Sequence, residues 1–148
     1  MKLTCRQLKC RQSKLRSKLL CAINKMPRDI KYKTMTGDCA VLAIALQRIF
    51  EFGDLVAIIS DKEPEYLIHV VLKIGNKYYD GYGERTKKQL LNGSYVADWE
   101  IQDEIQETRR WIRPKFSLVS VEEDEALKYT ESTLGIDEMI NIIKDLLS

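Results

Sequence analysis

The sequence predicts a single α+β domain in which a central buried helix packs on a small antiparallel sheet. Residues 40–46 are apolar without interruption, which predicts a helix enclosed on nearly every side. Residues 54–83 alternate short apolar runs with polar or glycine turns, the pattern of antiparallel strands. Residues 3–25 and 136–147 carry apolar residues at helical spacing, so we expect helices to cover the core at both ends.

Composition and length favour one soluble globular domain over residues 1–148. A hydrophobic share of 45% beside 31% charged residues is typical of such domains. We divide the domain into a basic N-terminal helix (1–26), a catalytic-like core (34–83) and a mostly helical cover (84–148). No apolar run is long enough to span a bilayer, and the N-terminus lacks a signal-peptide core. We therefore expect a cytoplasmic protein without membrane contact, whose four cysteines are free thiols.

The N-terminal helix is expected over residues 3–25, because leucines and an isoleucine recur there at helical spacing. Pro27 ends it, since proline lacks an amide donor and restricts the residue before it. Residues 28–37 are then expected to be a connector. Thr36 or Asp38 is expected to cap the following helix.

The central helix is expected over residues 38–51 and is closed by Glu51-Phe52-Gly53. Three strands follow, at "DLVAIIS", "YLIHVVLKI" and "KYYDGYG". Gly75-Asn76 predicts a two-residue hairpin loop between the second and the third strand. With such a loop, the numbers of paired residues sum to 151.

The rest of the chain is predicted to be mainly helical. A capping box formed by Ser120 and Glu123 is expected to start one of these helices. The expected elements are a short turn or helix at 85–92, a polar helix at 98–110, a strand at "FSLVSV", and helices near 121–130 and 136–147.

The charge is distributed unevenly along the chain. Residues 1–33 hold eleven Lys or Arg and one acid, a net charge of +10, whereas the whole chain has only +2, which leaves −8 for residues 34–148. A basic segment of this kind binds an acidic partner or nucleic acid, or docks on its own acidic domain. The docked helix is the favoured interpretation.

Cys39 stands at the start of the central helix, where a thiol is not needed for packing. The free amides and the dipole of a helix N-terminus favour an anion, and therefore the nucleophilic thiolate. The alternative is a small buried hydrophobe, which most free cysteines are.

His69 is the only histidine, and it interrupts an apolar strand. In the expected hairpin register Val71 faces Asp80, so Asp80 is a diagonal neighbour of His69 on the same face. A carboxylate there can hold one imidazole nitrogen and leave the other for Cys39. Each residue also has a structural explanation: a core imidazole for His69 and a turn residue for Asp80. Together they have the order nucleophile, base and orienting group.

At this point the chain resembles the papain-like superfold, on the residues "GDCAVLAIALQ" and "EYLIHVVLKIGNKYYDGYG". The layout is most similar to transglutaminase-like proteases and arylamine N-acetyltransferases, over residues 34–83. The resemblance implies Cys39 as nucleophile, His69 as general base and acid, and Asp80 as the orienting group. The chain departs from papain in having no Trp after Cys39 and no Gln a few residues before Cys39.

Without that Gln, the oxyanion hole would need the Cys39 amide and a second donor. Tyr32 and Thr36 are the nearest upstream candidates. Tyr78 and Tyr82 share a face with Asp80, either as an aromatic rim for an extended substrate or as ordinary strand aromatics.

These observations predict a thiol hydrolase or acyltransferase that acts on an amide or isopeptide bond of a peptide or protein. No cofactor is required, and neither Cys-x-x-Cys nor a second histidine is present to form a metal site. The alternative is a catalytically inactive papain-like scaffold that binds protein or nucleic acid through its basic N-terminal helix.

Overall fold

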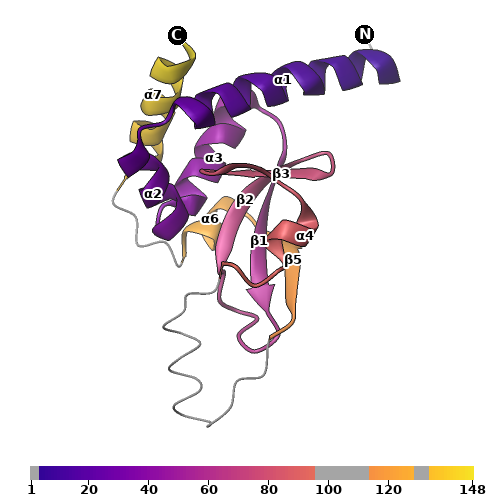
Figure 1. Cartoon of the computed structure of the whole chain (residues 1–148), viewed down its shortest axis with the longest axis vertical. Helices are drawn as coiled ribbons and strands as arrows, with labels where there is room; N and C mark the ends of the chain where they lie inside the picture. Colours follow the sequence, from indigo (N-terminus) through magenta and orange to yellow (C-terminus); the bar gives the residue numbers. More distant parts are fainter. Residues whose placement is uncertain (1–3, 96–113, 129–133) are drawn as a thin grey trace.

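The computed structural model describes residues 4–95, 114–128 and 134–148 and has a mixed α+β fold (Figure 1). Five antiparallel strands form one sheet in the order β4-β3-β2-β1-β5. The strands are β1 (Asp54–Ser60), β2 (His69–Ile74), β3 (Lys77–Asp80), β4 (Gly83–Arg85) and β5 (Phe116–Ser120). The predicted α+β class with a small antiparallel sheet is confirmed.

Six helices surround this sheet in the described ranges. They are α1 (Cys5–Lys25), α2 (Arg28–Thr36), α3 (Cys39–Phe50), α4 (Lys87–Leu90), α6 (Glu123–Leu127) and α7 (Ile136–Leu147). Every residue from 40 to 46 of α3 is buried, as the apolar run predicted. Helix α3 packs against β2 on one side and against α7 and α2 on others, so it is the centre of the main core.

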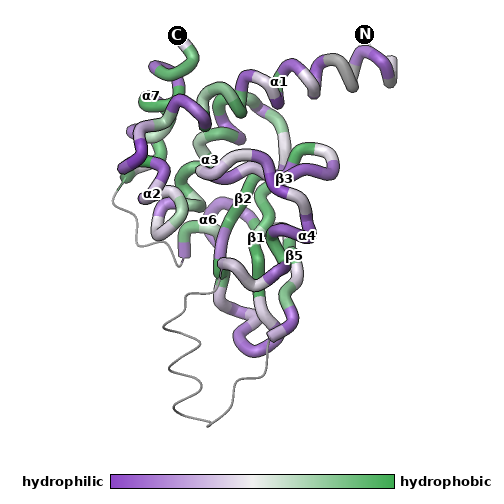
Figure 2. Tube along the Cα trace, in the orientation of Figure 1, coloured by the Kyte–Doolittle hydropathy of each residue, from purple (hydrophilic) through white to green (hydrophobic). Residues whose placement is uncertain are grey.

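The sheet is buried on both faces, which explains why β1 is apolar at successive positions. Leu55 and Ala57 belong to the main core under α3, whereas Val56 and Ile58 belong to a second cluster on the opposite face. Leu90 of α4 completes that second cluster. In Figure 2 the apolar colour accordingly runs along β1 and through α3 and α7.

The β2–β3 hairpin has the predicted register. Leu72 pairs with Tyr79 and Ile74 with Lys77, so the loop is Gly75-Asn76. Gly75 has φ +63°, a left-handed conformation that glycine adopts without steric cost. This register puts Asp80 at the end of β3, beside the beginning of β2.

Several local predictions are wrong. Residues 28–36 form a helix instead of a connector, because Pro27 acts as the N-cap and its ring does not obstruct the helix that follows. The capping box at Ser120 is absent, since Glu122 is the N-cap of α6 and forms no side-chain cap bond. The edge strand β4 was not predicted. The helix expected at 98–110 lies outside the described residues.

Helix α1 docks on the body through its second half. Leu19, Ala22 and Ile23 are almost fully buried there, and Arg16 donates a hydrogen bond to the Ile74 carbonyl oxygen at 3.2 Å. The first half extends past the body (Figure 1). Of the helices in the described residues, α1 included, none combines the length and the apolar character needed to cross a bilayer.

Candidate functional site

One helix and the two strands of a hairpin meet at one end of the sheet. Strand β2 begins at His69, strand β3 ends at Asp80, and helix α3 begins at Cys39. The hairpin register brings the strand ends together, and the packing of α3 against β2 brings the helix start to them. Each group is therefore positioned by backbone hydrogen bonding or by core packing, which limits its movement.

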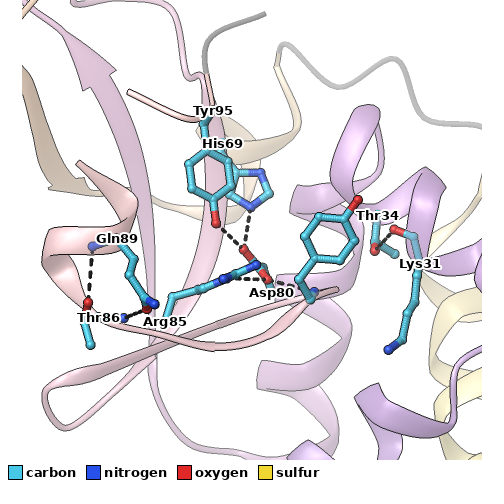
Figure 3. A network of polar contacts seen from close by, with 9 residues as sticks. Lys31, Thr34, His69, Asp80, Arg85, Thr86, Gln89 and Tyr95 are labelled. Carbon is cyan, nitrogen blue, oxygen red and sulfur yellow. Dashed lines mark hydrogen bonds and ion pairs between the residues drawn. The ribbon is translucent and has the colours of Figure 1, made fainter. Parts of the chain in front are cut away.

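His69 and Asp80 are in direct contact inside the protein. The imidazole Nε2 lies 3.2 Å from the carboxylate Oδ2, and each residue is only 2% exposed (Figure 3). The predicted side-chain pairing of His69 and Asp80 across the hairpin is thus present. A buried carboxylate beside one ring nitrogen fixes the orientation of the ring and leaves Nδ1 for another partner.

Asp80 has further donors that hold it in place. Its Oδ1 accepts a hydrogen bond from the Tyr82 amide at 2.9 Å and lies 3.8 Å from Nε of Arg85, while the Tyr95 hydroxyl donates to Oδ2 at 2.8 Å (Figure 3). Burial alone would raise the pKa of Asp80. The hydrogen bond and charge of His69, helped by Tyr95 and Tyr82, overcome burial and lower the pKa of this carboxyl below its usual value.

Tyr95 is a site residue that the sequence did not reveal. Its ring stacks on the His69 ring, with centroids 4.6 Å apart and planes inclined by 23°. The same residue therefore covers the imidazole and anchors its carboxylate partner. It lies in an irregular segment after α4, with no strand or helix pattern to indicate which face it reaches, so only the tertiary structure identifies it.

Cys39 is partly exposed and interacts with His69. Burial raises the pKa of the Cys39 thiol, but the His69 hydrogen bond and charge, with the backbone amides of Val70 and Ala40, lower it overall. Burial lowers the pKa of His69, yet hydrogen bonds to Asp80 and Cys39 raise it to about 9. Both shifts favour a thiolate beside an imidazolium at neutral pH.

Helix α2 is held against this site by the turn after β3. A side chain at Gly81 would collide with Oγ1 of Thr34, which is fully buried and donates to the Lys31 carbonyl oxygen at 2.7 Å. The absence of a Cβ at Gly81 thus lets α2 lie directly on the β3–β4 turn (Figure 3).

The other predicted site residues divide between the surface and the core. Tyr32 and Tyr82 are exposed and line one shared groove, whereas Tyr78 is buried in the second core as an ordinary strand aromatic. Thr36 already donates its hydroxyl proton to the Tyr32 carbonyl oxygen at 2.9 Å. Neither oxyanion candidate is linked to the thiol by a contact among the described residues.

The site contains groups for proton transfer and nucleophilic attack. Over the part of the chain that the structure describes, no cluster of three or more His, Cys, Asp or Glu side chains has an arrangement that could hold a metal ion. No family model, curated protein or solved structure matches this chain. Its function must therefore be argued from the geometry and electrostatics of the site.

Proposed function

We propose that this protein is a thiol hydrolase or acyltransferase, in which Cys39 attacks the acyl carbon of an amide or isopeptide bond in a peptide or protein. The arrangement of the three groups and their order along the chain support the likeness to papain-like and transglutaminase-like enzymes. The observation that carries the proposal is the buried pair of His69 and Asp80, together with the electrostatic interaction of His69 with Cys39 at the start of α3.

The reaction proceeds in two halves that return the site to its starting state. The Cys39 sulfur forms a bond to the acyl carbon, the carbon–nitrogen bond breaks, and the imidazolium of His69 gives its proton to the departing amine. Water or a second amine then attacks the thioester, His69 accepts its proton, and the carbon–sulfur bond breaks. Asp80 stabilises the imidazolium in both halves without taking up a proton.

The amide groups at the start of α3 are suited to stabilise the tetrahedral oxyanion. The first N–H groups of a helix have no partner within the helix, and the positive end of the dipole of α3 lies at Cys39. A preorganised donor of this kind accelerates acyl transfer on the order of 10²–10³-fold. Tyr32 and Thr36 are the side-chain candidates for a second donor.

The first test is the rate of iodoacetamide alkylation as a function of pH, resolved by cysteine in a mass spectrometer. We expect Cys39 to react well below pH 8, because its pKa is lowered. Its alkylation rate should change again near pH 9, where His69 loses its proton. Cys21, an exposed thiol in α1, is the reference within the same chain.

The His69→Ala variant should remove this reactivity at low pH while leaving Cys21 unchanged. His69→Gln serves as a second variant that keeps a polar side chain in the buried position, and circular dichroism verifies that each variant is folded. If Cys39 reacts like Cys21 at every pH in the wild-type protein, the proposal is wrong.

The binding-module alternative is favoured by one observation. Arg11, Lys14 and Lys18 are exposed on α1, and the first half of this helix extends beyond the body. If nucleic acid binds this surface, the logarithm of the binding constant should fall linearly with the logarithm of the salt concentration. Such binding in the absence of any Cys39 reactivity would favour the alternative over the enzyme.

A further inference from the structure

A groove lies between α2 and the turn that follows β3. Its volume is about 470 Å³, large enough for one or two side chains of a ligand. The residues that line it are Met26, Arg28, Lys31, Tyr32 and Tyr82. Tyr32 is 64% exposed and Tyr82 is 57% exposed, so both rings present apolar surface to a ligand in the groove.

Two short stretches of the chain connect the groove to the thiol site. The amide of Tyr82 donates to Asp80, so the residue that lines the groove also supports the carboxylate of the triad. On the other wall, α2 ends at Thr36, and α3 begins with Cys39 three residues later. The contact of Thr34 with Gly81 fixes the distance between the two walls.

The lining combines two cations with apolar and aromatic surface. Arg28 and Lys31 contribute positive charge, and no carboxylate is among the lining residues; Asp29, the acid of α2, is not part of the lining. The guanidinium of Arg85 lies 5.7 Å from the centre of the Tyr82 ring, but it faces Asp80 at 3.8 Å and is not part of the lining, so Arg28 and Lys31 are the charges offered to a ligand. A neutral or basic ligand would leave these charges without partners.

We propose that this groove binds an acidic residue of the peptide substrate, next to the acyl group that Cys39 attacks. The carboxylate pairs with Arg28 and Lys31, and its aliphatic stem or an apolar neighbour packs between Tyr32 and Tyr82 on Met26. The inference rests on the proposed thiol chemistry, because it treats the groove as a substrate subsite. It assigns the exposed tyrosines a role in specificity.

Binding is measured with the full chain carrying Cys39→Ala, so that no chemistry intervenes. The probes are two fluorescein-labelled pentapeptides, Gly-Glu-Leu-Glu-Gly and its Gln counterpart Gly-Gln-Leu-Gln-Gly, followed by fluorescence polarisation. We expect the Glu peptide to bind at least tenfold more tightly. Equal binding of the two peptides, or binding of neither, would overturn the inference.

Charge-reversal variants locate the site of binding. Arg28→Glu and Lys31→Glu should each weaken the Glu peptide at least tenfold, whereas Lys33→Glu, on the same helix but outside the lining, should weaken it less than threefold. An equal loss of affinity in all three variants would indicate a general electrostatic attraction to the protein and would contradict binding in the groove. Stronger displacement by an unlabelled single-stranded oligonucleotide than by the unlabelled Glu peptide would assign the groove to nucleic acid and overturn the inference.

The alkylation experiment separates this inference from the proposed function. If Cys39 is activated but the peptides do not discriminate, the groove assignment alone is wrong. If the Glu peptide binds but Cys39 is unreactive, the groove is no substrate subsite, and the inference fails together with the proposed function.

Discussion

His69 illustrates how a buried side chain can remain charged. Burial of an imidazole disfavours its protonated form, and for a lone histidine this effect would dominate. Here the hydrogen bonds and charges of Asp80 and Cys39 reverse the outcome and raise its pKa to about 9. Asp80 in turn is supported by Tyr95 and by the Tyr82 amide, so the charge of His69 depends on residues that do not touch Cys39.

Asp80→Asn should lower the pKa of His69. The amide retains the shape of the carboxylate but carries no negative charge, so burial is opposed less strongly, and a decrease of about 1–3 units is expected. Because His69 is the only histidine, its ring proton signals in NMR give the titration directly. The wild-type midpoint near pH 9 should move toward neutrality, and an unchanged or higher midpoint would contradict the role of Asp80.

Tyr95→Phe should destabilise the site while leaving the His69 ring covered. The Phe ring can still stack on His69, but Asp80 loses the hydroxyl donor at 2.8 Å. A hydrogen bond to a charged group contributes about 1.5–3 kcal/mol to the free energy of unfolding, which urea denaturation measures. Tyr32→Phe, at an exposed position, is the matched control and should change the free energy of unfolding little. Equal effects of the two substitutions would show that the Tyr95–Asp80 bond does not stabilise the fold.

At the scale of elements, the site depends on where α2 lies. This helix supplies one wall of the groove and leads directly into α3, and it contacts the β3–β4 turn through Thr34 and Gly81. Gly81 is required by this close approach and not by its backbone angles, since its φ is not in the positive region. The contact therefore couples the groove to the strand that carries Asp80.

Gly81→Ala should destabilise the protein by about 1–3 kcal/mol, because the added methyl group overpacks a fully buried contact. The double variant Gly81→Ala/Thr34→Ala removes the colliding hydroxyl and should recover part of this loss. Urea denaturation of both single variants and the double variant gives the coupling energy. Strict additivity of the two substitutions would contradict the proposed close approach.

The sequence was informative for elements whose pattern is local. The Gly75-Asn76 loop fixed the hairpin register, and the apolar run of α3 indicated its burial, so the side-chain pairing of His69 and Asp80 could be predicted. Helix α2 was missed because its sequence is mostly charged and polar and does not repeat apolar residues at helical spacing. Tyr95 and Arg85 could not be predicted, since Tyr95 lies in an irregular segment that folds back onto Asp80 and Arg85 lies in the edge strand β4, which was not predicted.

At the scale of the molecule, the basic and acidic parts of the chain are joined through the second half of α1. The predicted docking of a basic helix on its own domain holds for Leu19, Ala22 and Ile23, which lie in the main core, while exposed basic residues occur in both halves of the helix. Among the described residues, those before Leu19 contribute nothing to the buried core cluster. The start of the helix can therefore be removed without opening the core.

Removal of residues 1–11 should leave both the melting temperature and the alkylation profile of Cys39 nearly unchanged. The retained segment includes Arg16, which bonds to the Ile74 carbonyl oxygen, and the buried residues that follow it. In contrast, Ile23→Ala in the full chain should cost about 2–5 kcal/mol, because it opens a cavity in the core. Thermal denaturation and the alkylation assay, performed on both proteins, measure the two effects. A truncated protein that kept its melting temperature but lost Cys39 reactivity would show that residues 1–11 act on the site, whereas equal reactivity would show that the thiol chemistry does not depend on them.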